Sequence, residues 1–392
     1  MKTGQKKIKI ALFSDGMSSE SFDGVSMTLY TVFNKLPREN FDVLLISAKP
    51  PTDKKSFQFR SLKIPSTKLP FYKDYPIALP SLSLKLKKEL NNFNPDIIHI
   101  TTPFFSGPYA LKYANKNKIP TLTIYHTHFL SYLKYYFHRN SFMYPIAFKV
   151  LVKYLKNFYN KTNIVLVPTE IIKNELINYG IKPNLISTWR RGIDTNVFNP
   201  NQKDLNLYIN ITKNHNKNIL FVGRLVWYKG LQKLIEIYNH LETKRDDVNF
   251  IIIGDGPHKN KLQKHMPKAF FLGKLPHKQL PKFYASADCF LFTSDTETFG
   301  NVVLEAMACG CPVVVSDAGG PSELVTNNLT GFKIKDNRAS KYSEKIEEIL
   351  DNPKIKDTLS KQGIKFAQSQ SWEELTQKLI NFYNNLYEEN LN

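Results

Sequence analysis

Short apolar runs alternate with longer amphipathic segments from one end of this chain to the other. This is the pattern of parallel strands joined by helices, because each buried strand is followed by a helix that crosses back over the sheet. The strands predicted in the first half cover residues 8–14, 41–47, 96–101, 121–125 and 164–168. Those predicted in the second half cover residues 218–223, 249–254, 269–273, 289–293 and 312–316. We therefore expect an α/β protein with two doubly wound parallel sheets.

The chain is too long for one compact core, at 392 residues. A polar stretch rich in Asn and Lys, residues 199–216, separates the two sets of strands. We predict a first domain over residues 1–200 and a second over residues 201–370. An amphipathic segment at residues 371–392 comes after the last strand and could pack as a helix on either domain.

The composition excludes several classes of protein. With 42% hydrophobic residues the chain is neither disordered nor a collagen-like repeat. No stretch approaches the roughly 20 apolar residues of a membrane-spanning helix. The N-terminus runs from two lysines directly into a strand without the apolar core of a signal peptide, so we expect a cytoplasmic protein. The three cysteines lie in apolar surroundings and are expected in the core, as neither disulfides nor metal ligands.

The charge is strongly polarised along the chain. The net charge of +20 divides into +17 for residues 1–200 and +3 for residues 201–392. Such a basic first half should face an anionic partner: nucleic acid, a lipid headgroup layer or a phosphorylated substrate. Between Asp96 and Glu170 there is no acidic residue, yet this interval holds nine Lys or Arg and sixteen aromatic residues.

This acid-free interval has the composition of a helix that lies in a headgroup layer, where Tyr tolerates the interface and Lys meets anionic lipid. We predict an anionic membrane surface as a partner. The alternative is that the aromatic side chains form core and the lysines are only solvated. The residues predicted at the membrane or acceptor surface are Tyr132, Lys134, Tyr135, Tyr136, Phe137, Arg139, Lys149, Lys153 and Lys156.

Two glutamates follow the predicted strand at residues 289–293. Glu297 lies in a polar loop, and Glu305 lies about one turn into the next helix, with Gly300 between them. Carboxylates accept hydrogen bonds from neighbouring hydroxyls, so this pair suits a sugar at one end and a ribose at the other. The helix N-terminus suits the diphosphate between them. The alternative is that Glu297 caps the helix and that Glu305 is a solvated helix residue.

Two cations follow the first predicted strand of the second half. Arg224 leaves that strand, and Lys229 precedes Gly230, where the next helix opens. Both side chains can converge on one diphosphate. The spacing differs from that of a P-loop. The alternative is that both cations are solvated loop residues.

Together these elements resemble glycosyltransferase family 4, whose members are retaining enzymes of the GT-B fold. The elements of the second half are Glu297-x7-Glu305, Gly-Arg-Leu-x4-Lys-Gly at 223–230, Gly254-Asp255-Gly256-Pro257 and Asp317-Ala318-Gly319-Gly320-Pro321. In the first half, Asp23-Gly24-Val25 resembles the glycine loop of the family, and His126 resembles its cleft histidine. Arg191 stands where many members carry Asn.

Within the family, the chain looks most like the branch that glycosylates membrane lipids. That branch includes glucosyl-, mannosyl- and sulfoquinovosyl-diacylglycerol synthases and phosphatidylinositol mannosyltransferases. The resemblance implies two Rossmann-like domains that face each other across a deep cleft, the first for the acceptor and the second for the nucleotide sugar. It also implies that the C-terminal helix could cross back to the first domain.

The resemblance implies a role for each matching residue. Arg224 and Lys229 would neutralise the leaving nucleoside diphosphate, Glu297 would hold the hexose, Glu305 the ribose, and His126 the transferred hexose near its anomeric carbon. The implied catalytic residues are His126, Arg224, Lys229 and Glu297. The implied donor-binding residues are Gly24, Arg224, Lys229, Gly254, Gly256, Glu297, Phe299, Gly300, Asn301, Val302 and Glu305.

The family resemblance also implies that no metal and no other cofactor are needed. Asp295-Thr296-Glu297 looks like a metal-binding motif, but enzymes of this family resemble one another in needing no divalent cation. Retention of configuration could use a carboxylate nucleophile. The first half offers no acid with a claim to that place, so we expect a front-face mechanism in which the leaving phosphate takes the proton of the acceptor.

We expect a hexose to move from a nucleotide sugar to a lipid at the cytoplasmic membrane face, with UDP-hexose favoured over GDP-mannose as donor. A soluble acceptor, such as a sugar phosphate or polysaccharide intermediate, is the alternative within the same chemistry. A nucleic-acid-binding protein is disfavoured because helix-turn-helix, zinc-finger and RNP signatures are missing. A dehydrogenase is disfavoured because the Gly-x-Gly-x-x-Gly motif is missing after the first strand.

Overall fold

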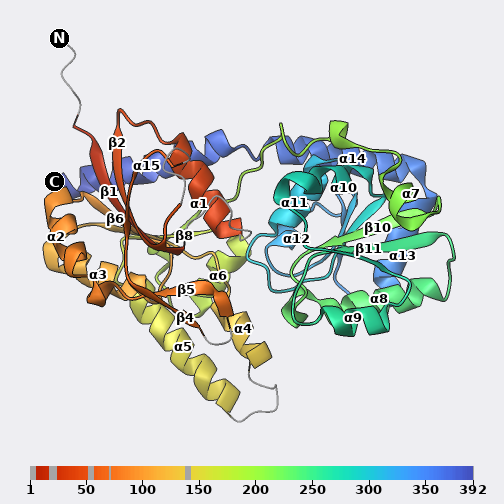
Figure 1. Ribbon diagram of the computed structural model, residues 1–392, viewed down its shortest axis with the longest axis horizontal. Coiled ribbons are helices and arrows are strands. Elements are labelled where there is room, and N and C mark those ends of the chain that lie inside the picture. Colours follow the sequence, from red (N-terminus) through yellow and green to blue (C-terminus); the bar gives the residue numbers. More distant parts are fainter. Residues whose placement is uncertain (1–5, 17–23, 52–56, 70–71, 137–142, 392) are drawn as a thin grey trace. The chain divides into compact units, whose positions relative to one another are not determined.

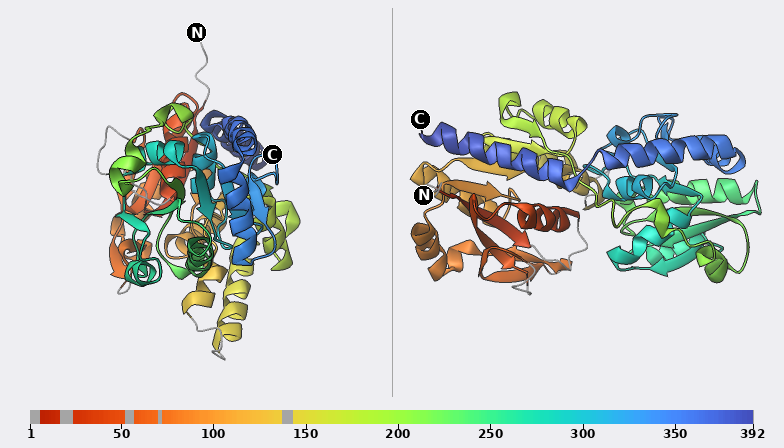
Figure 2. Two further views of the ribbon diagram at one scale, coloured as in Figure 1. Left: turned by 90° about the vertical axis from the view of Figure 1, so that its right-hand side faces the viewer. Right: turned by 90° about the horizontal axis from the view of Figure 1, so that it is seen from above.

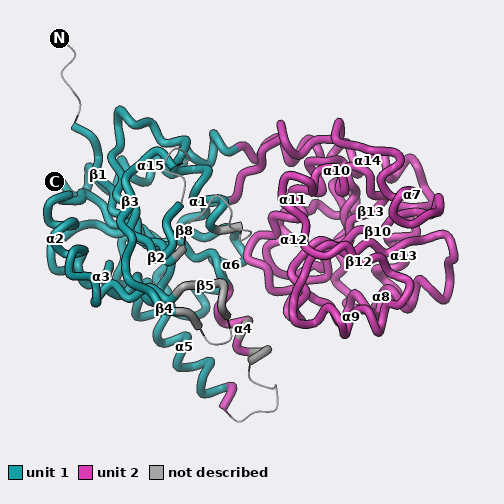
Figure 3. Tube along the Cα trace, in the orientation of Figure 1, with its two compact units in different colours: residues 1–127, 145–190, 372–392 teal, residues 128–144, 191–371 magenta. Residues whose placement is uncertain are grey.

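The computed structural model describes residues 6–16, 24–51, 57–69, 72–136 and 143–391. The chain forms two compact units, which are coloured separately in Figure 3. Unit 1 consists of residues 1–127, 145–190 and 372–392, and unit 2 consists of residues 128–144 and 191–371. The division therefore falls ten residues before the predicted boundary at residue 200, and residues 128–144 group with the second unit.

Unit 1 contains a seven-stranded parallel sheet in the order β3-β2-β1-β6-β7-β8-β9. Its strands are β1 (Ile8–Gly16), β2 (Phe41–Lys49), β3 (Arg60–Lys63), β6 (Ile97–Ile100), β7 (Thr121–Ile124), β8 (Ile164–Val167) and β9 (Ile186–Thr188). A separate antiparallel pair consists of β4 (Ser66–Leu69) and β5 (Tyr72–Ala78). In β1, Ile10 pairs with Val43 of β2 and with Ile97 of β6, so β1 is a central strand.

Helices cover both faces of this sheet (Figure 1). They are α1 (Gly24–Lys35), η1 (Pro80–Leu82), α2 (Leu84–Phe93), α3 (Ser106–Asn117), α5 (Met143–Tyr159), α6 (Glu170–Asn178), η2 (Pro183–Leu185) and α15 (Trp372–Leu391). The short helix α4 (Phe129–Tyr136) lies in the segment grouped with unit 2, as does the start of α5.

The C-terminal helix α15 is part of unit 1. Figure 2 shows it, in blue, beside the elements that follow the N-terminus, in red. Leu379 and Tyr383 are fully buried among core residues of this unit. The Trp189 indole N–H donates to the Leu375 carbonyl oxygen at 3.0 Å, and Lys35 of α1 pairs with Glu373. The last helix of the chain thus belongs to the same hydrophobic core as the first strand.

Unit 2 contains a six-stranded parallel sheet in the order β12-β11-β10-β13-β14-β15. Its strands are β10 (Lys217–Val222), β11 (Val248–Ile253), β12 (Phe270–Gly273), β13 (Cys289–Phe292), β14 (Val313–Ser316) and β15 (Phe332–Ile334). Its helices are η3 (Pro200–Gln202), α7 (Leu207–Thr212), η4 (Trp227–Lys229), α8 (Leu231–Glu242), α9 (Lys259–His265), η5 (His277–Gln279), α10 (Leu280–Ser286), α11 (Asn301–Ala308), α12 (Pro321–Leu324), α13 (Ala339–Asp351) and α14 (Pro353–Gln368). The prediction of two doubly wound parallel sheets is confirmed.

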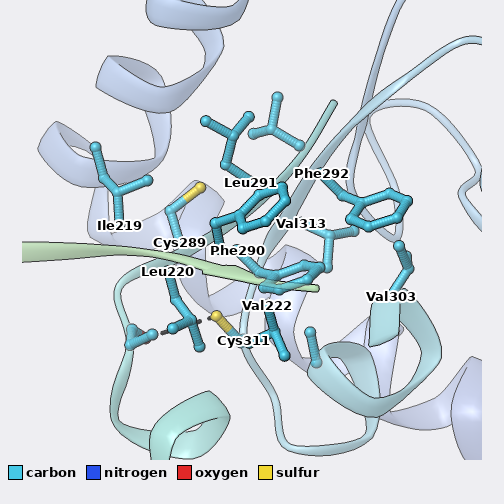
Figure 4. Close-up of a cluster of buried hydrophobic side chains, with 14 of the residues drawn as sticks. Ile219, Leu220, Val222, Cys289, Phe290, Leu291, Phe292, Val303, Cys311 and Val313 are labelled. Carbon is cyan, nitrogen blue, oxygen red and sulfur yellow. Dashed lines mark hydrogen bonds between the residues drawn. The ribbon is translucent and has the colours of Figure 1, made fainter. Parts of the chain in front are cut away.

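The core of unit 2 explains why its strands read as unbroken apolar runs. All six residues of β11 are buried, as expected for a parallel strand with helices on both faces. Figure 4 shows Phe290 and Phe292 of β13 in this core together with Cys289 and Cys311. All three cysteines are free and buried, which confirms that they are small core residues.

Candidate active site

A group of predicted residues meets at the C-terminal edge of the six-stranded sheet. The strand order reverses between β10 and β13, so the loops after these two strands diverge at this point, where doubly wound sheets bind ligands. Arg224 follows β10, Lys229 ends η4, and Glu297 lies in the loop after β13. The structure therefore places all three side chains in the loops at one sheet edge.

Two glycines let the loops of this edge approach one another. Gly230 has a φ of +75°, and a Cβ atom there would lie 2.1 Å from the Thr293 carbonyl oxygen. Gly254, after β11, has a φ of +144°, and a Cβ atom there would lie 1.8 Å from the Gly223 carbonyl oxygen. Only glycine permits both these backbone conformations and these approaches.

Lys229 lies among charged and polar groups. Its ammonium group forms an ion pair with Glu297. Burial, and then the nearby charge of Arg224, lowers the pKa of Lys229 to about 8. The Thr296 hydroxyl donates to the Tyr228 carbonyl oxygen at 2.8 Å, which holds η4 against the loop that carries Glu297. Two cations and a carboxylate are thus held close together at the strand ends.

Glu305 of α11 is buried, and both of its carboxylate oxygens have protein partners. Oε1 accepts from Nε2 of His277 at 2.9 Å, and Oε2 accepts from the Tyr284 hydroxyl at 2.9 Å. The hydrogen bond to Glu305 raises the pKa of His277. The structure thus excludes the alternative of a solvated Glu305. Sequence reasoning did not find either partner.

The other predicted donor residues lie at the start of α11. Gly300 is the N-cap of this helix with a φ of +95°, and a Cβ atom there would lie 2.8 Å from Cγ of Pro321. The Gly320 N–H donates to the Glu297 carbonyl oxygen at 2.7 Å, which joins the loop after β14 to the loop after β13. The four predicted residues here are Phe299, Gly300, Asn301 and Val302.

Asp295, the first acid of the metal-like motif, has a protein partner. The Ser316 hydroxyl donates to its Oδ1 atom. Among the residues that the structure describes, no three His, Cys, Asp or Glu side chains gather as a metal site would require.

Unit 1 carries candidate residues at the C-terminal edge of its own sheet. His126 follows β7 and is half-buried. His99 of β6 is fully buried, with Nδ1 at 2.6 Å from the Tyr383 hydroxyl oxygen. Burial, and then the charge of His126, lowers the pKa of His99 to about 3, so that this side chain is neutral. Gly24 is the first residue of α1.

Asp15 is a carboxylate at this edge that sequence reasoning missed. It is the last residue but one of β1 and is 1% exposed. Its Oδ1 atom accepts from the Ser106 backbone N–H at 3.3 Å. Burial raises its pKa from the ordinary value of 3.8 to about 7, although hydrogen bonds from Ser106 act in the opposite direction. Its one sequence signal is its position directly after the predicted strand at residues 8–14.

The segment predicted to face a membrane is described only in part. The side chains of Tyr132, Lys134, Tyr135 and Tyr136, and the whole of Phe137 and Arg139, lie outside the described residues. Lys149, Lys153 and Lys156 lie on α5 and are exposed. Among the helices described, none is long and apolar enough to cross a bilayer.

Two doubly wound parallel sheets, the second with Arg224, Lys229 and Glu297 at its switch point, have the architecture of a glycosyltransferase of the GT-B type. The family described as Glycosyltransferase Family 4 matches residues 22–197, and the one described as Glycosyl transferases group 1 matches residues 207–366. The chain belongs to glycosyltransferase family 4, which confirms the resemblance seen in the sequence. It is a retaining glycosyltransferase with a nucleotide-sugar donor.

Curated relatives cover most of the chain. A GDP-mannose-dependent alpha-mannosyltransferase of Corynebacterium glutamicum is 29% identical over 93% of this chain and 87% of its own length. The sulfoquinovosyl transferase SQD2 of Arabidopsis thaliana is 28% identical over 96% of this chain and 73% of its own. An alpha-monoglucosyldiacylglycerol synthase of Streptococcus pneumoniae is 25% identical over 83% and 74%.

Solved structures agree in fold. A sucrose-phosphate synthase from Thermosynechococcus elongatus aligns with a TM-score of 0.80 at 21% identity, covering 98% of this chain and all of its own. The Anabaena protein HepE in complex with UDP-glucose aligns with a TM-score of 0.75 at 19% identity, covering 96% of this chain and all of its own. At these identities the similarity supports the GT-B fold and no more.

Proposed function

We propose that this enzyme transfers a hexose from a nucleotide sugar to a lipid such as diacylglycerol, while bound peripherally at the cytoplasmic face of a membrane. A UDP-hexose is the favoured donor, and GDP-mannose is the other candidate. The name alpha-monoglucosyldiacylglycerol synthase, carried by two of the relatives, supports a lipid acceptor. The observation that carries the proposal is the surface of α5.

Helix α5 exposes an apolar face next to a basic face. Its exposed apolar residues recur at intervals of three or four and therefore share one side of the helix. They are Met143, Ile146 and Val150, with exposures of 43%, 52% and 64%. The exposed lysines Lys149, Lys153 and Lys156 have the same spacing on the adjoining side. Leu155 and Phe158, which are buried, attach the C-terminal half of the helix to unit 1.

These two faces match the chemistry of a bilayer surface. Aliphatic side chains enter the boundary between headgroups and acyl chains, while lysines meet anionic headgroups. Each lysine near such a surface contributes on the order of 1 kcal/mol. Helix α5 lies within the stretch of sequence between Asp96 and Glu170, which contains no acidic residue. No carboxylate that is near the helix in sequence therefore opposes its attraction to anionic lipid.

In this proposal each residue of the donor site has a role. Arg224 and Lys229 neutralise the negative charge that develops on the leaving diphosphate, so that no metal ion is required. Glu297 holds the hexose, and Glu305, oriented by its protein partners, holds the ribose. His126 binds the transferred hexose near its anomeric carbon. The leaving phosphate takes the proton of the acceptor hydroxyl, which gives retention by front-face transfer.

Vesicle binding tests the membrane part of the proposal. Vesicles of phosphatidylcholine with a rising fraction of phosphatidylglycerol would be sedimented with the wild-type protein and with a triple variant, Lys149→Glu, Lys153→Glu and Lys156→Glu. We expect wild-type binding to rise with phosphatidylglycerol and to fall with salt, and the triple variant to bind roughly 100-fold more weakly.

A matched control carries Lys264→Glu, Lys354→Glu and Lys365→Glu, three exposed lysines of unit 2. It has the same net charge as the triple variant of α5, so only the location of the change differs. The control should bind vesicles like the wild-type protein. Equal losses in both triple variants, or binding that ignores lipid charge, would contradict a membrane role for α5.

A further inference from the structure

A row of aromatic rings joins helix α5 to the loop before α3. Tyr154 of α5 stacks on the buried Phe158 with 6.5 Å between ring centroids, and on Phe104 of the loop with 5.3 Å. The ring of Phe105 follows, 6.3 Å from that of Phe104. The Tyr154 hydroxyl donates to the Pro103 carbonyl oxygen at 2.5 Å. These contacts fix the loop to a helix that Phe158 attaches to unit 1.

The outer end of this row is an exposed apolar surface. Phe105 is 39% exposed and Tyr154 is 36% exposed. Val150, one turn before Tyr154 on α5, is 64% exposed. We call Phe104, Phe105, Val150 and Tyr154 the aromatic patch. Contiguous exposed apolar residues, unlike single ones, mark surfaces that bind a ligand, a protein or a membrane.

The backbone of Phe105 is strained, and packing of its side chain recovers only part of the cost. Its φ is 51° and its ψ is −93°, a conformation that is rare for a residue with a side chain and accessible to glycine. The ring contacts Phe104, but more than a third of the residue is exposed. Strain of this kind concentrates at binding and catalytic sites. We therefore expect the ring of Phe105 to contribute to binding more than to stability.

The aromatic patch lies at the edge of the unit 1 sheet where a ligand is expected. The strand order reverses between β1 and β6, and Phe105 is in the loop that follows β6. The next residue, Ser106, donates its backbone N–H to Asp15 near the end of β1. Open α/β sheets bind ligands outside the carboxyl ends of the strands at such a reversal.

The charge near the patch matches a lipid layer. Lys149 and Lys153 lie within one turn of Val150 on α5 and are exposed. The sequence between Asp96 and Glu170 contains no acidic residue. A bilayer presents anionic headgroups beside acyl chains, and aromatic and aliphatic side chains enter the boundary between them. Cations beside exposed apolar groups have the same order.

We propose that the aromatic patch inserts among the acyl chains of the lipid layer and so brings lipid to the ligand-binding edge of the unit 1 sheet. The inference rests on the proposed function and deepens it, because it assigns the headgroups to the lysines of α5 and the acyl chains to the patch. Burial of apolar groups does not depend on screening by salt, whereas the attraction of lysines to anionic headgroups does.

Fluorescence quenching by lipid tests the insertion. Full-length Phe105→Trp would be bound to vesicles of phosphatidylglycerol and of phosphatidylcholine with brominated acyl chains, which quench a tryptophan that reaches them. The wild-type protein has three tryptophans, so its signal is subtracted. We expect the added indole of Phe105→Trp to lose fluorescence. Leu329→Trp is the matched control, because Leu329 is 45% exposed and lies in unit 2. Its added indole should keep its fluorescence.

Vesicle binding of Phe105→Gly gives a second readout, which a packing role would not produce. Glycine adopts this backbone conformation without strain, so the Tm should equal or exceed that of the wild type. Loss of the ring should nevertheless weaken binding roughly 10-fold, by the same factor at low and at high salt. Leu329→Gly is the control and should bind like the wild-type protein. Val150→Ser, at a more exposed position of the patch, is the second variant if Phe105→Gly does not fold.

The inference and the proposed function fail in different ways. An unquenched indole in vesicle-bound Phe105→Trp, or wild-type binding in folded Phe105→Gly, would overturn the inference and leave the lysines of α5 as the membrane contact. A quenched Phe105→Trp in an enzyme that glycosylates soluble alcohols and no lipid would support the inference and overturn the lipid acceptor. A wild-type protein that binds no vesicle of any composition would overturn both.

Discussion

Lys229 and Arg224 supply the positive charge on which the proposed chemistry depends. We expect Lys229→Ala and Arg224→Ala each to lower kcat by about 10²–10³, with a smaller effect on KM, because the opposing charge is greatest in the transition state. Initial rates at saturating donor measure this effect. Lys233→Ala is the control, because Lys233 pairs with Glu236 on α8 in the same unit. More than half of wild-type turnover in both site variants would refute the assignment.

Because of Asp15, the free energy of unfolding should fall as pH rises. Its pKa is about 7 in the folded protein and near 3.8 in the unfolded chain, so the protonated carboxyl stabilises the fold at low pH. That contribution falls as pH rises from about 4 and is lost above about 7. Between pH 5 and 8 the free energy of unfolding of Asp15→Asn should gain on the order of 2–3 kcal/mol relative to wild type, measured by urea unfolding. A pH-independent difference would contradict the raised pKa.

At the scale of single residues, the sequence predicts the position of a side chain when it lies in the loop directly after a strand. That Arg224, Lys229 and Glu297 lie at one sheet edge could be predicted, because the ends of parallel strands lie at one edge of a sheet. His277 and Tyr284 were not found, since they reach Glu305 from a different loop and helix, and no local spacing links them to it. Burial decides the state of Asp15, and burial of a single polar residue is not visible in a sequence.

At the scale of elements, the central strands and the edge strand β12 were predicted, whereas the edge strands β3, β9 and β15 were not. β10 and β11 are long apolar runs, because helices cover both of their faces. β3 is largely exposed, and β9 and β15 have three residues each with a polar residue among them, so none of the three forms an unbroken apolar run. The place of α15 in unit 1 is set by tertiary contacts such as the hydrogen bond from Trp189 to Leu375.

Substitutions at two glycines of unit 2 distinguish the energetic cost of a steric collision from the cost of a strained backbone conformation. Gly254→Ala should lower the free energy of unfolding by about 4 kcal/mol or more, because its φ is +144° and its Cβ would collide with the Gly223 carbonyl. Gly273 also has positive φ, +70°, but a Cβ there meets nothing within 4 Å. Gly273→Ala should cost only about 1–2 kcal/mol in thermal or urea unfolding. Equal costs would mean that strain alone governs both positions.

At the scale of the whole molecule, the two sheets divide the chemistry. Unit 2 holds the cations and carboxylates of the proposed donor site, and unit 1 holds His126, Asp15 and most of α5. Counted by unit, the net charge of +20 divides into +12 for unit 1 and +8 for unit 2, because residues 128–144 (+2) belong to unit 2 and residues 372–392 (−3) belong to unit 1. The difference in charge between the units is therefore smaller than the difference between the two halves of the sequence, and the first division between the units after α6 falls after Arg190, not at the predicted residue 200.

Metal removal tests whether side chains alone neutralise the negative charge of the leaving diphosphate. Because Arg224 and Lys229 supply the positive charge, we expect full activity in excess EDTA. Radiolabel transfer would be measured after dialysis against EDTA, with and without added Mg²⁺ or Mn²⁺. Loss of transfer with EDTA and recovery with either metal would contradict this and would make Asp295 a candidate ligand.

The most direct test of the central claim is the product that the wild-type enzyme makes. Radiolabelled UDP-hexoses and GDP-mannose would be incubated with the protein and with dioleoylglycerol in vesicles rich in phosphatidylglycerol, and the lipid extract would be analysed by chromatography, mass spectrometry and NMR. The account predicts label in a lipid-extractable hexosyl-diacylglycerol whose anomeric configuration matches that of the donor. Label found only in water-soluble products, or in a lipid of inverted configuration, would contradict it.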